Sequence, residues 1–148
     1  MTEIAFCNLA GAPLERGLAL LLEQIYAQGA RALVVAATAA RVEALNMALW
    51  TYRPDSFLPH GWAGDGAADE QPIWLTDREE NPNGATALVL IEGREWLDLA
   101  AFPACYYLFD RDDPAARDEA RERWRRYREG GHQLAYWEQS AAGWQSLD

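Results

Sequence analysis

The sequence predicts an α/β fold in which one mostly parallel sheet is flanked by helices. Short apolar runs without charged residues alternate with longer amphipathic segments, and this is the pattern of buried parallel strands joined by helices. The first connections are short, which favours right-handed crossovers. A chain of 148 residues, half of them hydrophobic, can bury a core of its own. We therefore expect one domain over residues 1–148.

The N-terminal third is expected to fold as strand, helix, strand, helix. Residues 4–9 and 32–37 form apolar runs that predict buried strands. Between them, residues 14–28 carry aliphatic side chains at helical spacing, and Gly29 follows as a C-cap. Thr38 is placed to cap a second helix, which ends at Trp50. The Pro- and Gly-rich segment that follows, residues 52–71, is expected to be a long loop.

The remainder of the chain supplies further strands and one charged helix. Strands are predicted over three apolar runs, at residues 72–76, 87–91 and 104–109. Asp112 or Asp113 caps the charged helix, which carries Pro114 in its first turn and ends at the glycine pair 130–131. Residues 133–138 are expected to form a last strand at an edge of the sheet, and residues 139–148 to form a tail.

Composition limits the classes of function. The formal net charge is −10, which argues against broad, non-specific binding to nucleic acid. Cys7 and Cys105 both fall inside predicted strands, as expected of reduced core thiols in a cytoplasmic protein. The N-terminus lacks the pattern of a secretory signal, and no apolar run reaches the roughly 20 residues that span a bilayer.

The residues also argue against most enzyme classes. The chain contains no lysine, so a P-loop or Schiff-base lysine is excluded. Residues 64–66, Gly-Asp-Gly, lack the spacing of a dinucleotide-binding loop. His60 and His132 have no partner at metal-ligand spacing, and His60 is expected to be a hydrogen-bonding loop residue. We expect no cofactor and no metal. The alternative is a small metal-dependent hydrolase or nucleotidyl enzyme that uses loop carboxylates such as Asp65.

The charged helix carries a row of arginines. Seven of the thirteen basic residues, all of which are arginine, lie between Arg111 and Arg128. Each residue of a helix advances by roughly 100° around the axis, so four of these side chains fall within a sector of about 60°, and a fifth lies at its edge. Such a row suits a ligand that is both anionic and apolar, such as an acidic peptide ending in an aromatic residue and a carboxylate. The row comprises Arg117, Arg121, Trp124, Arg128 and, at its edge, Arg125.

Two other interpretations of this helix stay open. Its charges can form an ordinary solvated face, with i,i+4 pairs such as Glu119–Arg123 and Glu122–Arg126. Arginine next to an aromatic ring also suits single-stranded nucleic acid, although the net charge disfavours it. A second surface is aromatic and includes Trp50 and Phe57. These rings either fold back onto the core or anchor a protein partner.

Three motifs in order resemble the chi subunit of bacterial DNA polymerase III holoenzyme, the HolC family. They are Ala-Leu-Trp at residues 48–50, Ser-Phe-Leu-Pro-His at 56–60 followed by Ala-Gly-Asp-Gly at 63–66, and Ala-Arg-Glu-Arg-Trp-Arg-Arg-Tyr-Arg at 120–128 with Gly131. Residues 53–55 and 77–84 depart from the family pattern. The resemblance implies a single-domain, three-layer, Rossmann-like α/β fold that binds no nucleotide.

The resemblance also implies a function. The family is a non-catalytic accessory of the clamp loader, and it binds the acidic, Phe-ended C-terminal tail of single-stranded DNA-binding protein. At the positions of the shared motifs, Trp50 and Phe57 correspond to the residues that, by this resemblance, contact the psi subunit or an alternative helicase partner. The tail-binding residues implied are Arg117, Arg121, Trp124, Arg125 and Arg128, which are those of the row.

Overall fold

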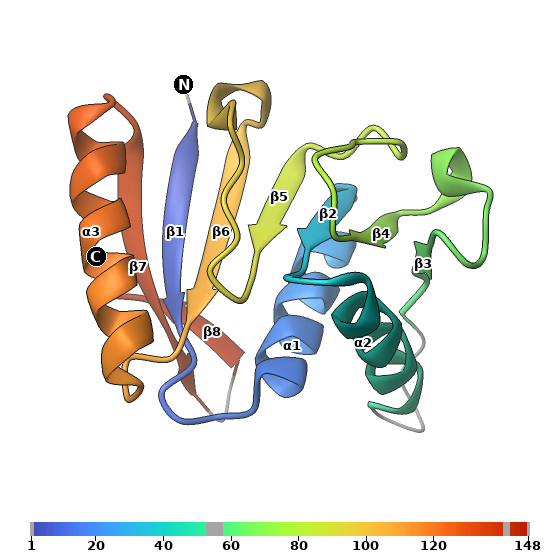
Figure 1. Ribbon diagram of the computed structural model, residues 1–148, viewed down its shortest axis with the longest axis horizontal. Helices are drawn as coiled ribbons and strands as arrows, with labels where there is room; N and C mark the ends of the chain where they lie inside the picture. The colour runs from blue at the N-terminus through green and yellow to red at the C-terminus, as the bar shows by residue number, and fades with distance from the viewer. Residues whose placement is uncertain (1, 53–57, 141–142, 148) are drawn as a thin grey trace.

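The strands form one sheet through the described part of the chain, residues 2–52, 58–140 and 143–147 of the computed structural model (Figure 1). In these residues the strand order is β3-β4-β2-β5-β6-β1-β7-β8, and neighbours are parallel except β7 and β8. The strands are β1 (Glu3–Asn8), β2 (Ala32–Val35), β3 (Gly61–Trp62), β4 (Ile73–Thr76), β5 (Ala87–Leu90), β6 (Ala104–Phe109), β7 (Gln133–Ser140) and β8 (Gly143–Ser146).

Helices cover both faces of the sheet, which confirms the predicted layered α/β fold. On one face, helices α1 (Leu14–Ala27) and α2 (Ala39–Thr51) share a buried cluster with the side chains of β1 and β2 that point to that face. On the other face, helix α3 (Pro114–Glu129) packs Ala120 and Tyr127 against the sheet. In Figure 1, α3 and α2 lie at opposite ends of the sheet.

The predicted helix starts are confirmed by their caps. Thr38 accepts a hydrogen bond from the backbone N–H of Arg41 at 3.2 Å. Of the two aspartates proposed for α3, Asp113 is the cap, since its carboxylate accepts from the N–H of Ala115 at 3.1 Å. Among the described residues, no helix has both the length and the apolar character needed to cross a membrane.

Two expectations about loops are wrong. Residues 139–140 and 143–146 do not belong to a tail, because β7 extends to Ser140 and β8 pairs with it in antiparallel fashion. The edge position therefore belongs to β8 and not to β7. The driving force is burial, since Trp144 on β8 is only 9% exposed and its Nε1 donates to the carbonyl of Gly17 in α1 at 2.9 Å. The long loop likewise contains β3 at the opposite edge and a 3-10 turn at Ala68–Glu70.

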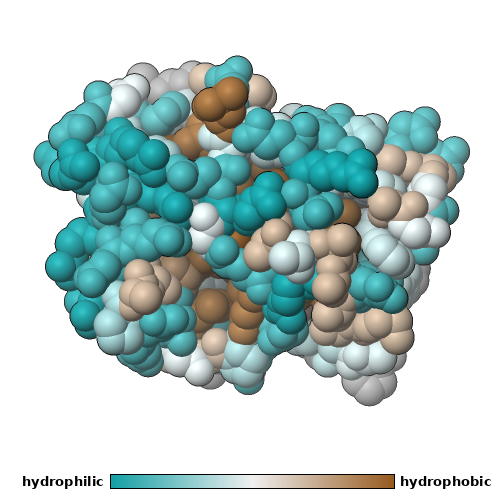
Figure 2. Space-filling view, viewed as in Figure 1, coloured by the Kyte–Doolittle hydropathy of each residue, from teal (hydrophilic) through white to brown (hydrophobic). Residues whose placement is uncertain are grey.

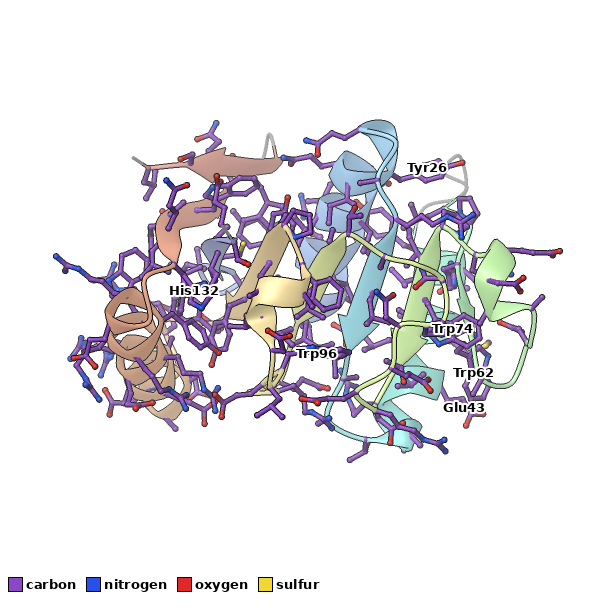
Figure 3. All side chains as sticks on the ribbon, turned by 90° about the horizontal axis from the view of Figure 1, so that it is seen from above. Tyr26, Glu43, Trp62, Trp74, Trp96 and His132 are labelled. Atoms are coloured by element: carbon purple, nitrogen blue, oxygen red, sulfur yellow. The ribbon has the colours of Figure 1, made fainter. Side chains whose placement is uncertain are left out.

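Most of the surface at the α3 end of the molecule is hydrophilic. Figure 2 shows hydrophilic residues over most of the end of the molecule that α3 forms. In the view from above, Trp62 and Trp74 lie near each other at the β3–β4 end, and His132 lies beside α3 at the far end (Figure 3).

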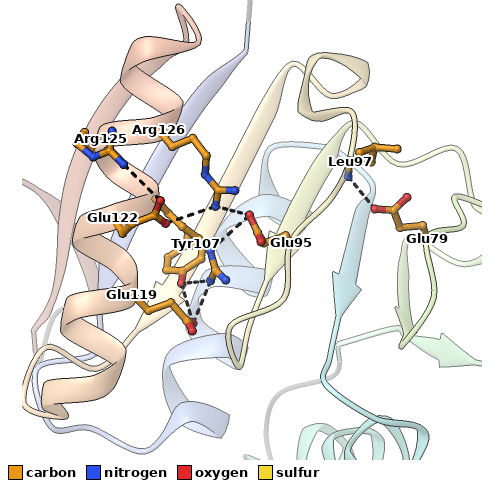
Figure 4. A network of polar contacts seen from close by, with 9 residues as sticks. Glu79, Glu95, Leu97, Tyr107, Glu119, Glu122, Arg125 and Arg126 are labelled. Atoms are coloured by element: carbon orange, nitrogen blue, oxygen red, sulfur yellow. Dashed lines mark hydrogen bonds and ion pairs between the residues drawn. The ribbon is translucent and has the colours of Figure 1, made fainter.

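A polar network fixes the rotation of α3 about its axis (Figure 4). Arg123, only 9% exposed, donates to the hydroxyl of Tyr107 on β6 at 2.6 Å and to Glu119 at 3.0 Å. The carboxylate of Glu95, in the β5–β6 connection, accepts from Arg126 at 2.5 Å and lies 3.5 Å from Arg123. Because these groups hold one side of α3 against the sheet, its opposite side is presented to solvent in a fixed orientation.

Replacing Trp144 should destabilise the protein. Trp144→Ala removes a buried indole and its hydrogen bond to α1, so the free energy of unfolding should fall by about 3 kcal/mol. Urea unfolding followed by circular dichroism measures this loss. The matched control is Gln145→Ala, whose side chain is exposed on the same strand and should change stability by less than about 0.5 kcal/mol. A loss of less than about 0.5 kcal/mol in Trp144→Ala as well would contradict this prediction.

Stability should fall at alkaline pH through Tyr127. Burial, reinforced by the carboxylate of Glu95, raises the pKa of Tyr127 to about 12, whereas tyrosine in an unfolded chain titrates near pH 10. Stability is therefore complete below about pH 10 and falls by about 2 kcal/mol as the pH rises to about 12, because only the unfolded state releases the proton.

The variant Tyr127→Phe isolates this contribution. The hydroxyl of Tyr127 makes no hydrogen bond within the described residues, so the substitution should leave stability at neutral pH nearly unchanged. Urea unfolding at several alkaline pH values should give a shallower decline for the variant than for the parent protein. A decline of the same slope in both proteins would assign the pH dependence to other groups.

Candidate functional site

Helix α3 lies across β1 because of the order of the strands. β1 sits between β6 and β7, so the crossover from β6 through α3 to β7 passes over it. Phe6 of β1 is consequently under the helix, where its ring centroid is 5.1 Å from that of Trp124 in an edge-on arrangement. Phe6 itself is 1% exposed. The indole is thus braced from below and partly exposed above.

A hollow of about 400 Å³ opens between the N-terminal half of α3 and the sheet. Its floor and walls are apolar and aromatic, and three arginines surround its rim. The rim residues are Arg117 and Arg121, from α3, and Arg111, from the loop that precedes it. The apolar lining comprises Phe6, Phe109, Ala120, Trp124 and Tyr136.

The rim is rich in uncompensated positive charge. Within the described residues, Arg111 and Arg121 make no ion pair, and neither does Arg128 further along the helix. Arg117 lies 3.9 Å from Asp118, and both side chains are substantially exposed, so the pair is weak. These guanidinium groups are therefore available to an anionic ligand.

The structure divides the predicted row into two parts. Arg117, Arg121 and Trp124 meet around the hollow, whereas Arg125 and Arg128 lie outside it, one or two turns along α3. Arg125 is also paired with Glu129 at 3.2 Å and Glu122 at 3.5 Å. The i,i+4 pairs expected on the neighbouring face are present, at 3.0 Å for Glu119–Arg123 and 3.6 Å for Glu122–Arg126.

Sequence reasoning missed several residues of the hollow. Arg111 lies in the arginine-rich span but outside the helix, so a helical projection cannot place it. Phe6, Phe109 and Tyr136 come from β1, β6 and β7. Only the strand order brings these three rings together. The one sequence signal for them is the presence of aromatic residues in otherwise aliphatic runs.

The second predicted surface is only partly described. Trp50, in the last turn of α2, is 45% exposed, and Met47 one turn earlier is 60% exposed. The centroids of the Trp50 and His60 rings are 4.2 Å apart. His60 is 3% exposed, and its ring nitrogens lie 2.7 Å and 3.2 Å from two backbone carbonyls, as expected of a hydrogen-bonding loop residue. Phe57 lies outside the described residues.

The groups weighed for other chemistry have structural roles. Asp65 accepts a hydrogen bond from the backbone N–H of Trp62 at 3.3 Å, within a turn. Cys7 and Cys105 are free and buried, and burial raises the pKa of the Cys105 thiol to about 12, so this thiol stays protonated. Of the residues with a described position, no three that could ligate a metal ion lie together.

Two comparisons with known proteins match this chain to the same protein subunit. Residues 1–135 match the sequence model of the DNA polymerase III chi subunit, HolC. A stretch of 71 residues is 38% identical to the probable DNA polymerase III subunit chi of Rickettsia prowazekii, and it covers 48% of this chain and 43% of that relative. The chain thus aligns with less than half the length of the curated relative.

The family is that of a non-catalytic accessory subunit of the DNA polymerase III holoenzyme, which acts in DNA replication. The match covers β1, β6, the whole of α3 and the first residues of β7. It therefore includes the helix and two of the strands, β1 and β6, that contribute side chains to the hollow. This chain therefore belongs to the DNA polymerase III chi subunit family.

Proposed function

We propose that this protein is a cytoplasmic accessory subunit of the clamp-loader complex, and that it binds the acidic C-terminal tail of single-stranded DNA-binding protein. The observation that carries the proposal is the hollow beside α3, in which an aromatic floor is surrounded by Arg111, Arg117 and Arg121. A tail that ends in Phe offers the matching chemistry, because it combines one aromatic side chain with several carboxylates.

The geometry suggests how the tail is held. The terminal ring enters the hollow and stacks against Trp124, which is fixed from below by Phe6. Carboxylates of the tail bind Arg117 and Arg121 in bidentate fashion, which guanidinium groups favour. Arg125 and Arg128 extend the positive surface along α3, although Arg125 must exchange its glutamate partners for those of the tail.

Binding of this kind depends on local and not on total charge. The protein as a whole carries −10, so long-range attraction for an acidic ligand is absent. The arginines act within a Debye length of about 8–10 Å at ordinary ionic strength. The apolar hollow supplies the part of the affinity that salt does not screen. Direct binding of single-stranded nucleic acid uses the same surface and is an alternative outcome of the experiments below.

We propose that the surface around Trp50 and Met47 contacts a second replisome component. A psi subunit or a helicase partner fits an exposed apolar patch of this kind. The role of Phe57 remains a prediction, since it lies outside the described residues. The two surfaces are carried by α2 and α3 at opposite ends of the sheet (Figure 1), so one protein can bind both partners at once.

Arg121→Ala should weaken binding of an acidic, Phe-terminated peptide. The variant loses a charge-assisted pair, so the affinity measured by isothermal titration calorimetry should fall by about 5- to 150-fold, or about 1–3 kcal/mol. The matched control is Arg126→Ala, an arginine of the same helix that is held by Glu95 on the opposite side. This control should change the affinity by less than about twofold.

The peptide itself provides a second control. Replacing its terminal Phe by Ala should reduce binding to the parent protein, because the hollow then has no ring to enclose. Affinity that is unchanged by both Arg121→Ala and the peptide substitution would refute the tail-binding proposal. A gel shift by purified protein with single-stranded DNA, lost in Arg121→Ala, would favour direct nucleic-acid binding instead.

Trp50→Ala should distinguish the two proposed binding surfaces, because it should affect only one of them. The variant should bind the tail peptide within about twofold of the parent protein, because the substitution lies far from α3 and removes no contact of the hollow. Its co-elution with purified clamp-loader subunits in size-exclusion chromatography should be reduced, since exposed tryptophans often dominate interfaces. Full co-elution of the variant would exclude Trp50 from the second interface.

A further inference from the structure

The most exposed large apolar side chain of the described residues belongs to neither of the proposed binding surfaces. It is Leu97, which is 91% exposed in the connection between β5 and β6. A single exposed leucine is ordinary on a protein surface. This one, however, borders a hollow of about 510 Å³ between the β5–β6 connection and the C-terminal end of α3. The apolar lining of the hollow comprises Trp96, Leu97, Leu99, Ala100 and Tyr127.

The backbone at Leu97 is held on one side by a hydrogen bond and on the other by packing. Its N–H donates to the carboxylate of Glu79, in the β4–β5 connection, at 2.7 Å (Figure 4). The ring of the preceding residue, Trp96, lies edge-on to that of Phe102 with the centroids 5.2 Å apart. Phe102 is 1% exposed and so belongs to the core. A partner that contacts Leu97 therefore meets a loop that is already ordered, which lowers the entropic cost of binding.

The uncompensated charges at this hollow are negative. Glu79 and Asp98 line it, are exposed, and make no ion pair with any residue that the structure describes. Glu95 and Arg126 line it as well, but they pair with each other at 2.5 Å. The remaining ionisable side chain of the lining is that of His132, which is partly buried. Two carboxylates are thus left without a positive partner.

Two further features of the hollow favour a cation. Gly130, the C-cap of α3, lines the hollow, so the negative end of the helix dipole lies beside it. The unpaired Arg128 of the same turn is not part of the lining. The indole of Trp96 is partly exposed, and the face of an aromatic ring attracts guanidinium and ammonium groups. The hollow therefore combines an apolar surface with a local preference for positive charge.

This combination selects among the possible occupants. Each copy of the protein carries a net charge of −10, and the surface around Leu97 is itself acidic, so two copies repel each other there. Nucleic acid and acidic peptides are disfavoured for the same reason. A segment of another protein that carries lysine or arginine beside large apolar side chains is complementary both in charge and in apolar character.

We propose that the Leu97 surface, defined as Leu97 and the other residues that line this hollow, binds a basic amphipathic segment of a partner protein. Leu97 packs between apolar side chains of the segment, one of which enters the hollow against Trp96. Basic side chains of the segment pair with Glu79 and Asp98. This inference is independent of tail binding, because the two hollows on either side of α3 share no residue.

The probe is a short synthetic peptide of leucine and lysine, patterned so that its leucines lie on one face of a helix. Its binding to the protein is measured by fluorescence anisotropy of a labelled peptide. Leu97→Asn removes the apolar anchor without changing any charge, and should weaken binding by about tenfold or more. The matched control is Leu147→Asn, which replaces a second leucine that is 56% exposed. This control should change the affinity by less than about twofold.

A pair of double variants separates local charge from net charge. Glu79→Gln with Asp98→Asn removes both unpaired carboxylates, and the Gln keeps an oxygen that can accept from the N–H of Leu97. Asp69→Asn with Glu70→Gln removes two charges from the 3-10 turn before β4. Both proteins have the same net charge, so non-specific attraction of the peptide falls equally in both. The first should weaken binding about fivefold or more, and the second less than about twofold.

The outcomes decide for or against the Leu97 surface. Equal binding by the parent protein, Leu97→Asn and the first double variant, each shown by circular dichroism to be folded, would overturn the inference. So would equal binding of a peptide that has glutamate in place of lysine. A parent dimer in analytical ultracentrifugation that Leu97→Asn dissociates would assign the surface to a second copy instead. Arg121→Ala should bind the Leu/Lys peptide as the parent does, so the tail-binding proposal stands or fails separately.

Discussion

The position of β1 between β6 and β7 is the constraint on which the candidate site depends. Because the crossover from β6 to β7 must pass over β1, α3 is laid across Phe6, and rings from three strands meet beneath the helix. The same crossover places the β6–α3 loop at the carboxyl end of β1, where Asn8 binds the backbone of Arg111. The apolar hollow and its charged rim therefore both follow from a single choice of strand order.

The arginines of α3 fall into two groups that the fold keeps on different sides of the helix. On the side facing the β5–β6 connection, Arg123 and Arg126 are engaged by Glu95, and Arg123 is also held by Glu119 and Tyr107. These charges are satisfied inside the molecule and fix the helix. On the other side, Arg117 and Arg121 lie around the hollow, where they are available to the proposed ligand. Had the helix been rotated by half a turn, the glutamates would face the hollow and repel an acidic partner.

The sequence predicts the fold class, the main elements and the helical row, because these depend on periodicity and local caps. The row is visible since Arg117, Arg121 and Trp124 belong to one helix. Arg111 is not visible, because its place depends on a long-range hydrogen bond to Asn8. The strand β8 escapes prediction for a similar reason, since Trp144 gains its partner, Gly17, only in the folded protein. Sequence patterns do not reveal these contacts, because the segments that make them lie far apart along the chain.

The absence of lysine is consistent with the proposal that this acidic protein binds an acidic ligand. A net charge of −10 gives no long-range attraction, so affinity has to arise at contact distance. At that distance a guanidinium group forms two parallel hydrogen bonds with a carboxylate and also stacks on a ring, whereas an ammonium group acts as a point charge. An arginine rim around an aromatic hollow can therefore select a carboxylate and a ring in a fixed relative position. In the proposed complex, the ligand is therefore selected by the geometry of the site and not by the total charge of the protein.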